Sequence, residues 1–387
     1  MALPPDFTLL QVVPELETGG AELSAVDVSR AVVRAGGRAL VASRGGRMVA
    51  RLEAEGGRLT PLPVNTKNPL LMLGNAVRLA RLIRQEKVSL VHARSRAPAF
   101  SALWAARATG TPFVATYHGI YKGRSGLKRW YNAVMTRGDL VIANSEFTRT
   151  HVLAEHGIDP GRVVAIPRGV DLERFDPARV RPDRVEALRQ AWGIAADDPR
   201  AVVLLAGRLT RIKGHLTILA AAARLAAAGR RDFLILFAGD DQGRSEYRAE
   251  LVNAISQAGV EAQVRMVGHC DDMPAAYLLA DLAILPTTVP ESFGRAAVEP
   301  QAMGRPVIAS AHGGATETVV DGKTGWLAPP GDPDAWAAAL ARGIDAGASG
   351  RARMGTNAMA RARALYRVDT MCEATLAVYQ RVLEARA

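Results

Sequence analysis

The sequence has few cysteines and no long apolar runs, the features that disulfide-bonded, cysteine-ligated metal and membrane-spanning proteins need. Cysteine occurs only twice in 387 residues, at Cys270 and Cys372, so neither a CxxC metal site nor a disulfide framework is indicated. No apolar run approaches the roughly 20 residues that a membrane-spanning helix needs. The first residues lack the basic start, apolar core and cleavage site of a signal peptide, so we expect a cytoplasmic protein.

Common nucleotide-binding and metal motifs are also missing. The first glycine turn, Gly19-Gly20, follows an apolar run at 7–13 and opens an amphipathic segment at 21–34. It matches neither G-x-G-x-x-G nor G-x-x-x-x-G-K-[ST], although it can bring backbone N–H groups close to a phosphate or serve only as a tight turn. The single D-x-D, at 332–334, has the sequence of a helix start, so we expect no divalent-metal site.

The composition is that of a globular chain with an uneven charge. Apolar residues make up 49% and charged residues 22%, and the length is sufficient for two domains. Residues 1–175 contain 24 Lys and Arg against 14 Asp and Glu, whereas the remainder contains 25 against 24. The basic first half is compatible with nucleic acid, an anionic membrane surface or a phosphate-bearing acceptor. Aromatic residues are only 5% and no recognition motif is present, which argues against nucleic acid.

Short apolar runs alternate with helical periodicity through most of the chain, which predicts an α/β protein with parallel sheets covered by helices on both faces. A proline-rich break at 167–182 separates two such stretches, so we expect domains at 1–170 and 183–365. A final helix at about 369–387 is long enough to cross between them. The expected strands lie at 7–13, 39–43, 58–62, 88–92, 112–117, 139–143 and 162–166, and then at 201–206, 233–238, 262–267, 281–285 and 306–309.

The most informative stretch is 290–306, a loop and short helix between two predicted strands. It carries Glu291, the pair Phe293-Gly294, and Glu299. Eight positions separate the two carboxylates, roughly 12 Å along a helix axis, which suits binding two hydroxyl-bearing parts of one ligand. A phosphate can rest on the helix N–H groups between them, as in a nucleotide-sugar. Glutamates near a helix start also occur for capping alone.

Cations follow the first strand of the second predicted domain. Arg208 ends that strand, and Lys213 precedes a helix at 215–227. The carboxyl ends of parallel strands meet at one edge, so we expect both cations near Glu291 and Glu299. An arginine fork and a lysine charge suit the two phosphates of a diphosphate, although scattered surface charges would carry no such meaning.

Other strand ends carry weaker candidates. Gly239 ends the next strand of the second domain, where the backbone can approach a nucleotide. In the first domain His118 ends a strand and can bind a substrate hydroxyl, or it can be satisfied by backbone. Ser145 is read as a helix cap.

Two basic clusters lie in the first half of the chain. A predicted helix at 70–87 has arginines at a spacing of three, and a second cluster runs into Trp130 and Tyr131. Cations mixed with interfacial aromatics suit a membrane surface or an anionic glycolipid, and a solvated helix face is the alternative. The basic residues are Arg78, Arg81 and Arg84 in the first cluster and Lys122, Arg124, Lys128 and Arg129 in the second.

Together these motifs resemble the family-4 retaining glycosyltransferases of GT-B fold. The residues that carry the resemblance are Gly19-Gly20, His118-Gly119, Gly207-Arg208 with Lys213-Gly214, Glu291 through Glu299, and Gly304-x-Pro306-Val307. The resemblance covers nearly the whole chain and implies two Rossmann-like domains whose parallel sheets face a central cleft. It implies that the second domain holds a nucleotide-diphosphate sugar, that the first takes a glycan or lipid-linked acceptor, and that the final helix returns to the first domain.

The resemblance also implies a role for each motif. Arg208 and Lys213 would neutralise the diphosphate, Glu291 would contact the hexose, Glu299 the ribose and His118 the donor sugar, while Phe293, Gly294 and Gly19-Gly20 would meet the phosphate region with backbone. It further implies hexosyl transfer with retained configuration, no divalent metal or other cofactor, and a place in cell-envelope polysaccharide or lipopolysaccharide synthesis at the inner face of the membrane.

Two residues depart from the family pattern, and other functions stay open. Pro300 stands where alanine is usual and removes a helix N–H, and Arg168 stands where the interdomain segment often has asparagine. A nucleotide-sugar epimerase or hydrolase on the same scaffold is one alternative. A non-catalytic basic protein that binds membrane or nucleic acid is another, and the basic first domain is the feature that favours it.

Overall fold

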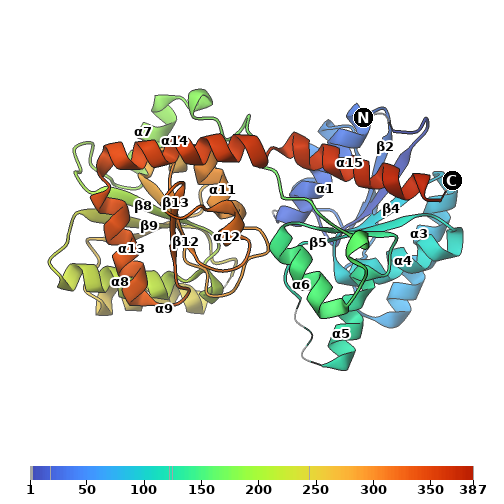
Figure 1. Ribbon diagram of the computed structural model, residues 1–387, viewed down its shortest axis with the longest axis horizontal. Coiled ribbons are helices and arrows are strands. Elements are labelled where there is room, and N and C mark those ends of the chain that lie inside the picture. Colours follow the sequence, from blue (N-terminus) through green and yellow to red (C-terminus); the bar gives the residue numbers. More distant parts are fainter. Residues whose placement is uncertain (1–2, 18, 122, 124, 244, 387) are drawn as a thin grey trace. The chain divides into compact units, whose positions relative to one another are not determined.

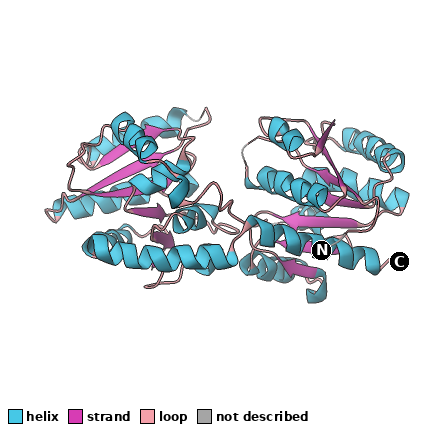
Figure 2. Ribbon diagram, turned by 90° about the horizontal axis from the view of Figure 1, so that it is seen from above, coloured by secondary structure: helices cyan, strands magenta, loops and turns pink. Residues whose placement is uncertain are grey.

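The structure is a computed structural model that describes residues 3–17, 19–121, 123, 125–243 and 245–386. The chain forms two compact units, Met1–Gly169 with Val368–Ala387 and Val170–Arg367. Each unit is a parallel sheet with helices on both faces, as Figures 1 and 2 show. The predicted α/β class with two parallel-sheet domains is therefore confirmed. No helix among the described residues is both long and apolar enough to cross a bilayer.

The sheet of the first unit has seven strands in the order β3-β2-β1-β4-β5-β6-β7. The strands are β1 Thr8–Val12, β2 Arg38–Ser43, β3 Arg58–Pro61, β4 Leu90–Ala93, β5 Phe113–Tyr117, β6 Leu140–Ala143 and β7 Val163–Ala165. The helices are α1 Gly20–Arg34, α2 Val49–Ala54, α3 Pro69–Gln85, α4 Arg96–Thr109, α5 Gly126–Asn132, α6 Glu146–His156 and α15 Val368–Glu384, with short 3-10 turns η1 Ala133–Thr136 and η2 Pro160–Arg162. In this sheet β1 pairs with both β2 and β4, so the strand order reverses there.

The sheet of the second unit has six strands in the order β10-β9-β8-β11-β12-β13. The strands are β8 Ala201–Ala206, β9 Phe233–Ala238, β10 Val264–Gly268, β11 Leu282–Leu285, β12 Val307–Ser310 and β13 Gly325–Ala328. The helices are α7 Pro182–Ala191, α8 His215–Ala227, α9 Ser245–Gln257, α10 Met273–Leu279, α11 Arg295–Ala302, α12 Ala315–Thr318, α13 Pro333–Asp345 and α14 Gly347–Leu365, with 3-10 turns η3 Pro177–Arg179 and η4 Arg211–Lys213. Here β8 and β11 are neighbours, which places the loops that follow them side by side.

Burial explains why the strands are continuous apolar runs. All six residues of β9 and all five of β5 are buried, as expected of strands covered by helices on both faces. The helices meet the sheets with one apolar side, for example Ile218 and Leu219 of α8 in the core of the second unit.

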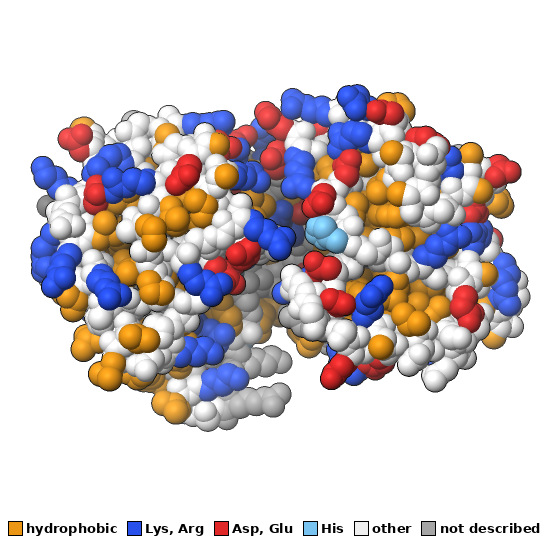
Figure 3. All heavy atoms as spheres, turned by 180° about the vertical axis from the view of Figure 1, so that it is seen from behind, with side chains coloured by type: hydrophobic (Ala, Val, Ile, Leu, Met, Phe, Trp, Pro, Cys, Tyr) orange, Lys and Arg blue, Asp and Glu red, His pale blue; other side chains and the backbone are white. Residues whose placement is uncertain are grey.

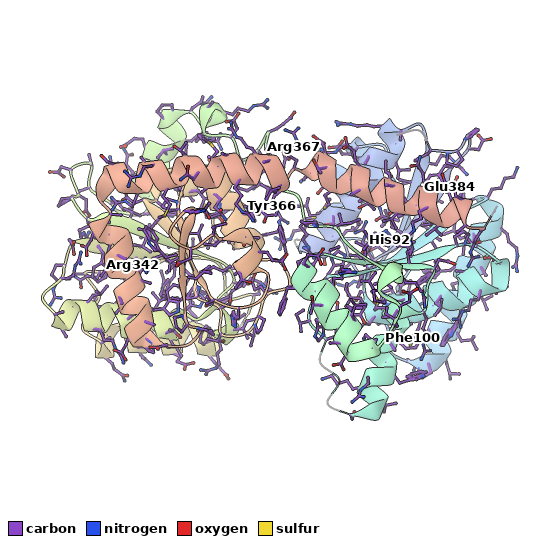
Figure 4. The ribbon with its side chains drawn as sticks, in the orientation of Figure 1. His92, Phe100, Arg342, Tyr366, Arg367 and Glu384 are labelled. Atoms are coloured by element: carbon purple, nitrogen blue, oxygen red, sulfur yellow. The ribbon has the colours of Figure 1, made fainter. Side chains whose placement is uncertain are left out.

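The last helix belongs to the first unit. In α15 the buried Tyr379 packs on Phe7, and its hydroxyl lies 2.6 Å from Nδ1 of His92 in β4. Thr116 contacts the other ring nitrogen of His92 at 2.7 Å. Figure 4 labels His92 in the first unit and Glu384 at the end of α15. The end of the chain is thus fixed to the first sheet by a buried polar contact as well as by apolar packing.

Candidate functional site

The candidate site lies where the loops after β8, β11 and β12 meet in the second unit. These three strands are neighbours in the sheet, so their carboxyl ends share one edge. Backbone hydrogen bonds join the loops: Thr288 N donates to Ile212 O at 3.0 Å, and Gly314 N donates to Glu291 O at 2.8 Å. The loop that carries Glu291 is therefore held from both sides.

Glycine is required at two of these contacts. Gly214, at the start of α8, has φ +76°, and a Cβ there would lie 1.8 Å from the carbonyl oxygen of Pro286. A Cβ on Gly314 would lie 2.5 Å from Cα of Phe293. Real Cβ atoms do not approach this closely, so the absence of a side chain at both positions is what lets the loops pack together.

Lys213 and Glu291 form an ion pair between these loops. The Nζ of Lys213 contacts Oε1 of Glu291, and the two side chains are 16% and 23% exposed. The sequence prediction that these residues share one edge of the sheet agrees with this contact. A partly buried lysine and carboxylate in contact fix each other's position.

Arg208 and Gly239 lie at the neighbouring strand ends. Arg208 is exposed, and its Nη1 lies 3.4 Å from Oε1 of Gln242. A Cβ on Gly239 would lie 1.9 Å from the carbonyl oxygen of Gly207, so the two strand ends pack directly on each other. Packing alone therefore accounts for a glycine at position 239.

Glu299 is held by partners of its own on α11. Its Oε1 accepts a hydrogen bond from Nη2 of Arg295 at 2.8 Å, and its Oε2 accepts one from the hydroxyl of Tyr277 at 3.3 Å. Burial, followed by the negative charge of Glu299, raises the pKa of Tyr277, which keeps that hydroxyl protonated and donating. Glu299 is thus a carboxylate in a fixed orientation, separate from the Lys213–Glu291 pair.

The start of α11 lies between the two glutamates. Gly294 is its N-cap, with φ +85° and no side chain that caps the helix. Phe293 is buried and packs edge-on against Tyr366 at 5.4 Å between ring centres, which anchors the loop before the helix. Ala297 N donates to the carbonyl of Gly294 at 2.9 Å, and a helix start with a glycine N-cap can offer its other N–H groups to a bound anion. Pro300 lies within α11, and the helix runs through it to Ala302.

Sequence reasoning did not identify several residues that support this site. His312, in the loop after β12, contacts Oγ1 of Thr287 at 3.3 Å, and burial lowers its pKa. Tyr277 and Arg295 were also not predicted. The Arg295–Glu299 spacing of four was an available signal, because residues four apart on a helix are neighbours. Among the described residues, no cluster of three or more His, Cys, Asp or Glu side chains is arranged to hold a metal ion.

His118 in the first unit is half-buried after β5, and Arg168 contacts it. The Nη2 of Arg168 lies 2.6 Å from Nδ1 of His118. Arginine only donates, so Nδ1 is the acceptor and the ring proton is on Nε2. Burial lowers the pKa of His118 well below its usual value, and the charge of Arg168 lowers it further. His118 is therefore a neutral donor through Nε2, and Arg168 fixes its tautomer.

The other predicted residues of the first unit have structural partners. Gly19 is the N-cap of α1, and a Cβ on it would lie 2.0 Å from a carboxylate oxygen of Glu22, which folds back over the turn. Ser145 caps α6, as predicted, by accepting a hydrogen bond from Thr148 N at 2.9 Å. Two basic residues of the second cluster, Lys122 and Arg124, fall outside the described residues.

Comparisons with known proteins identify the family. Residues 18–174 match the family model described as Glycosyltransferase Family 4, and residues 186–361 match Glycosyl transferases group 1. A solved glycosyltransferase from Rickettsia africae is 31% identical with a TM-score of 0.90, over 98% of this chain and 99% of that one. The chain belongs to the family-4 glycosyltransferases of GT-B fold.

Two further members of this group are informative. Anabaena HepE, solved in complex with UDP-glucose, is 25% identical with a TM-score of 0.81, over 98% of each chain. The D-inositol 3-phosphate glycosyltransferase 2 of Catenulispora acidiphila is 34% identical over 257 residues, which are 65% of this chain and 58% of that protein. The match thus spans little more than half the length of this curated relative.

Proposed function

We propose that this family-4 member transfers a hexosyl unit from a nucleotide-diphosphate sugar to a hydroxyl of a glycan or glycolipid. The observation that carries the proposal is the Lys213–Glu291 pair on loops that also form the uncapped start of α11. A cation, a carboxylate and a helix N-terminus at one sheet edge match a diphosphate joined to a sugar. The UDP-glucose complex of Anabaena HepE supports the same class of donor.

The charges of the site fit the chemistry of glycosyl transfer. As the bond to the sugar breaks, negative charge develops on the departing phosphate, so fixed cations stabilise the transition state more than the ground state. Arg208 and Lys213 are proposed to supply them. Glu291 holds Lys213 before the donor binds and is then proposed to accept hydrogen bonds from hexose hydroxyls. Glu299, oriented by Arg295 and Tyr277, is proposed to bind the ribose.

We further propose retention of configuration and independence of divalent metal. Arg208 and Lys213 provide positive charge that a metal otherwise supplies to a diphosphate. Within the described part of the chain we assign no carboxylate as the nucleophile of a double displacement, which fits attack of the acceptor on the same face. His118 is proposed to donate from Nε2 to the donor sugar, and Gly19-Gly20 to meet the phosphates with backbone.

The acceptor we favour is a lipid-linked glycan of the cell envelope, of polysaccharide or lipopolysaccharide type, met at the inner face of the membrane. The basic first unit supports a phosphate-bearing acceptor. An inositol phosphate is a second candidate, because the chain is 34% identical to a D-inositol 3-phosphate glycosyltransferase.

The test begins with the donor and ends with the product. The full chain is screened for thermal stabilisation by a panel of nucleotide-sugars, and the best donor is then incubated with glycolipid and inositol phosphate acceptors in excess EDTA. We expect a new glycosidic bond whose anomeric configuration, measured by NMR, equals that of the donor. Release of free sugar or of an epimer without a new bond would assign the chain to the hydrolase or epimerase class instead.

A further inference from the structure

Arg96, at the start of α4, is a cation that the first unit holds in one orientation. Its guanidinium carbon lies 3.9 Å from the ring centre of Tyr121 and 5.8 Å from that of Tyr131. Its Nη1 donates to Oδ1 of Asn132 at 2.7 Å. Tyr131 in turn packs on Phe100, which is labelled in Figure 4, at 5.3 Å between ring centres. The guanidinium is thus stacked on aromatic rings and tied to an amide, both favourable to a cation.

The partners of Arg96 are themselves fixed. Asn132 is fully buried, and its Nδ2 donates to the carbonyl of Tyr121 at 3.2 Å. The carbonyl of Asn132 accepts a hydrogen bond from the hydroxyl of Tyr117, a buried residue of β5, at 3.1 Å. Because the structure already fixes the guanidinium, a ligand that binds it has little side-chain freedom left to remove.

Part of this guanidinium is open to a ligand. Arginine has five N–H donors, and the bond to Asn132 uses one of them. Within the described part of the chain no residue accepts a hydrogen bond from Nε or Nη2 of Arg96, and the side chain is only partly covered. Lys and Arg are common on the surface, as one face in Figure 3 shows, but Arg96 is anchored by a buried residue. Its Nε and Nη2 edge matches the two oxygens of a carboxylate or phosphate.

The position is electrostatically unfavourable for a cation without an anion beside it. Arg96 is the first residue of α4, and the first turn of that helix has no acidic side chain. The N-terminus of a helix carries partial positive charge, so a cation there is repelled. Among the described residues Arg96 has no carboxylate in an ion pair. A bound anion would relieve this repulsion.

Arg96 also lies close to the residue proposed to contact the donor sugar. It follows β4, and Tyr121 follows the neighbouring β5, so both lie at the carboxyl edge of the first sheet. Tyr121 folds back over Gly119, where a Cβ would lie 3.2 Å from its Cε1. Burial raises the pKa of Tyr121, and the charges of Arg96 and Arg168 lower it, so both guanidiniums lie near its hydroxyl. The ring of Tyr121 therefore separates Arg96 from the Arg168–His118 contact.

We propose that Arg96 binds a carboxylate or phosphate group of the acceptor, close to the hydroxyl that receives the sugar. Nε and Nη2 donate to the two oxygens of that anion, and Tyr121 covers the other side of the guanidinium. The inference rests on the proposed function and narrows its acceptor to a class, the anionic glycans and polyol phosphates. Arg96 sets acceptor specificity, because a neutral acceptor leaves its N–H groups to water.

Acceptors in matched pairs test the preference. The full chain is given the donor that the nucleotide-sugar screen selects. Methyl glucuronide is compared with methyl glucoside for the carboxylate, and inositol 1-phosphate with inositol for the phosphate. We expect at least one anionic compound to be used with a kcat/KM about 10- to 100-fold above that of its neutral partner, the gain expected from hydrogen bonds to a charged group. The pair that shows the preference identifies the anion.

Variants of α4 assign the preference to Arg96. Arg96→Gln removes the charge and keeps a helix-forming side chain, so kcat/KM for the anionic acceptor is expected to fall to that for the neutral one. Arg96→Lys keeps the charge without the planar fork and is expected to retain only part of the preference. Arg107→Gln, in the exposed last turn of the same helix, is the matched control and is expected to behave like the unmodified chain. An unchanged preference in Arg96→Gln, or an equal loss in Arg107→Gln, would overturn the proposal.

Two further measurements separate this inference from the proposed function. The melting temperature, with and without the nucleotide-sugar, is expected to show that each variant is folded and still binds the donor through the second unit. Calorimetry measures binding of the same four compounds without turnover. Anion binding that depends on Arg96, in a chain that transfers no sugar, would overturn the proposed function and leave the anion site. Equal use of both members of each pair would overturn the inference and leave the proposed function standing.

Discussion

At the scale of single residues, the pair formed by Lys213 and Glu291 is the centre of the candidate site. Each group neutralises the other while the donor is absent, so neither carries an unpaired charge in a partly buried place. A diphosphate competes for the lysine and leaves the carboxylate for hydroxyls. The ion pair therefore holds the ammonium of Lys213 and the carboxylate of Glu291 in place before the donor binds.

Removing the lysine tests this assignment. Lys213→Ala is expected to lower kcat by about 100-fold or more, because a cation that stabilises developing charge is lost. Arg211→Ala is the matched control, since Arg211 lies in the same short turn but pairs with Glu250 at an exposed position. Turnover is measured with the donor that the nucleotide-sugar screen selects and with the acceptor that it modifies. Full turnover in Lys213→Ala, or an equal loss in both variants, would contradict the role given to Lys213.

The ribose assignment rests on Glu299. Glu299→Gln keeps the shape but removes the charge, so the affinity for the nucleoside diphosphate is expected to fall about tenfold, as for the loss of hydrogen bonds to a charged group. Calorimetry with UDP or with whichever nucleotide the screen selects measures it. Glu246→Gln, at an exposed position of α9, is the control. Unchanged affinity in Glu299→Gln would remove this residue from the site.

At the scale of elements, α8 begins with a strained, tightly packed turn. Gly214 precedes the helix with φ +76°, and Gly229 follows it with φ +81°; a Cβ on Gly229 meets nothing within 4 Å. Gly229→Ala is therefore expected to lower the unfolding free energy by only about 1 kcal/mol, because alanine is disfavoured in the left-handed backbone conformation. Gly214→Ala adds the clash with Pro286, so we expect a loss of about 3 kcal/mol or more in unfolding free energy, and weaker donor binding. Equal losses in urea unfolding would show that the loops do not pack as described.

A buried histidine at the start of α8 makes stability depend on pH. Burial lowers the pKa of His215 to about 4, whereas an unfolded histidine titrates near 6.5. Because the folded pKa is depressed, the unfolded state gains the proton first as pH falls below about 6.5, and stability is lost until pH 4. Between pH 7 and 5, the unfolding free energy of His215→Gln is expected to fall by about 2 kcal/mol less than that of the unmodified protein. Parallel pH profiles for the two proteins, measured by urea unfolding, would contradict the assignment.

Sequence patterns predict the strands and helices but not all of the contacts between them. The apolar runs at 201–206 and 233–238 became β8 and β9, because strands buried on both faces need continuous apolar sequence. The Lys213–Glu291 contact followed from the shared edge of a parallel sheet. The Arg168–His118 contact joins positions fifty apart, and periodicity does not report it. The exposed leucines of α3 were missed because an amphipathic pattern shows one apolar side and does not show that a second lies in solvent.

At the scale of the whole molecule, the two units differ in how the chain builds them. The second unit, Val170–Arg367, is continuous in sequence, whereas the first needs α15 from the far end of the chain. Beneath α15, burial holds the pKa of His92 well below its usual value, so Tyr379 and Thr116 contact a neutral ring. The helix therefore covers both apolar and polar groups of the first sheet.

Shortening the chain tests this dependence. A chain that ends at Arg367 is expected to lose native structure in the first unit, since the groups that α15 buries would face water, while the second unit stays folded and is still stabilised by the donor. Limited proteolysis with mass spectrometry locates the protected segment. Tyr379→Phe is a milder variant, expected to cost about 1 to 3 kcal/mol by leaving a His92 nitrogen unpaired. A protected first unit in the shortened chain would contradict the role given to α15.

The placement of α15 also sets an order of events during synthesis. When residue 367 leaves the ribosome, every strand and helix of the second unit is available, but the first sheet, although made earlier, still lacks its outer helix. The usual order, in which the domain translated first also finishes folding first, is thereby reversed. The amino-terminal half must wait, partly uncovered, until residues 368–387 have been made.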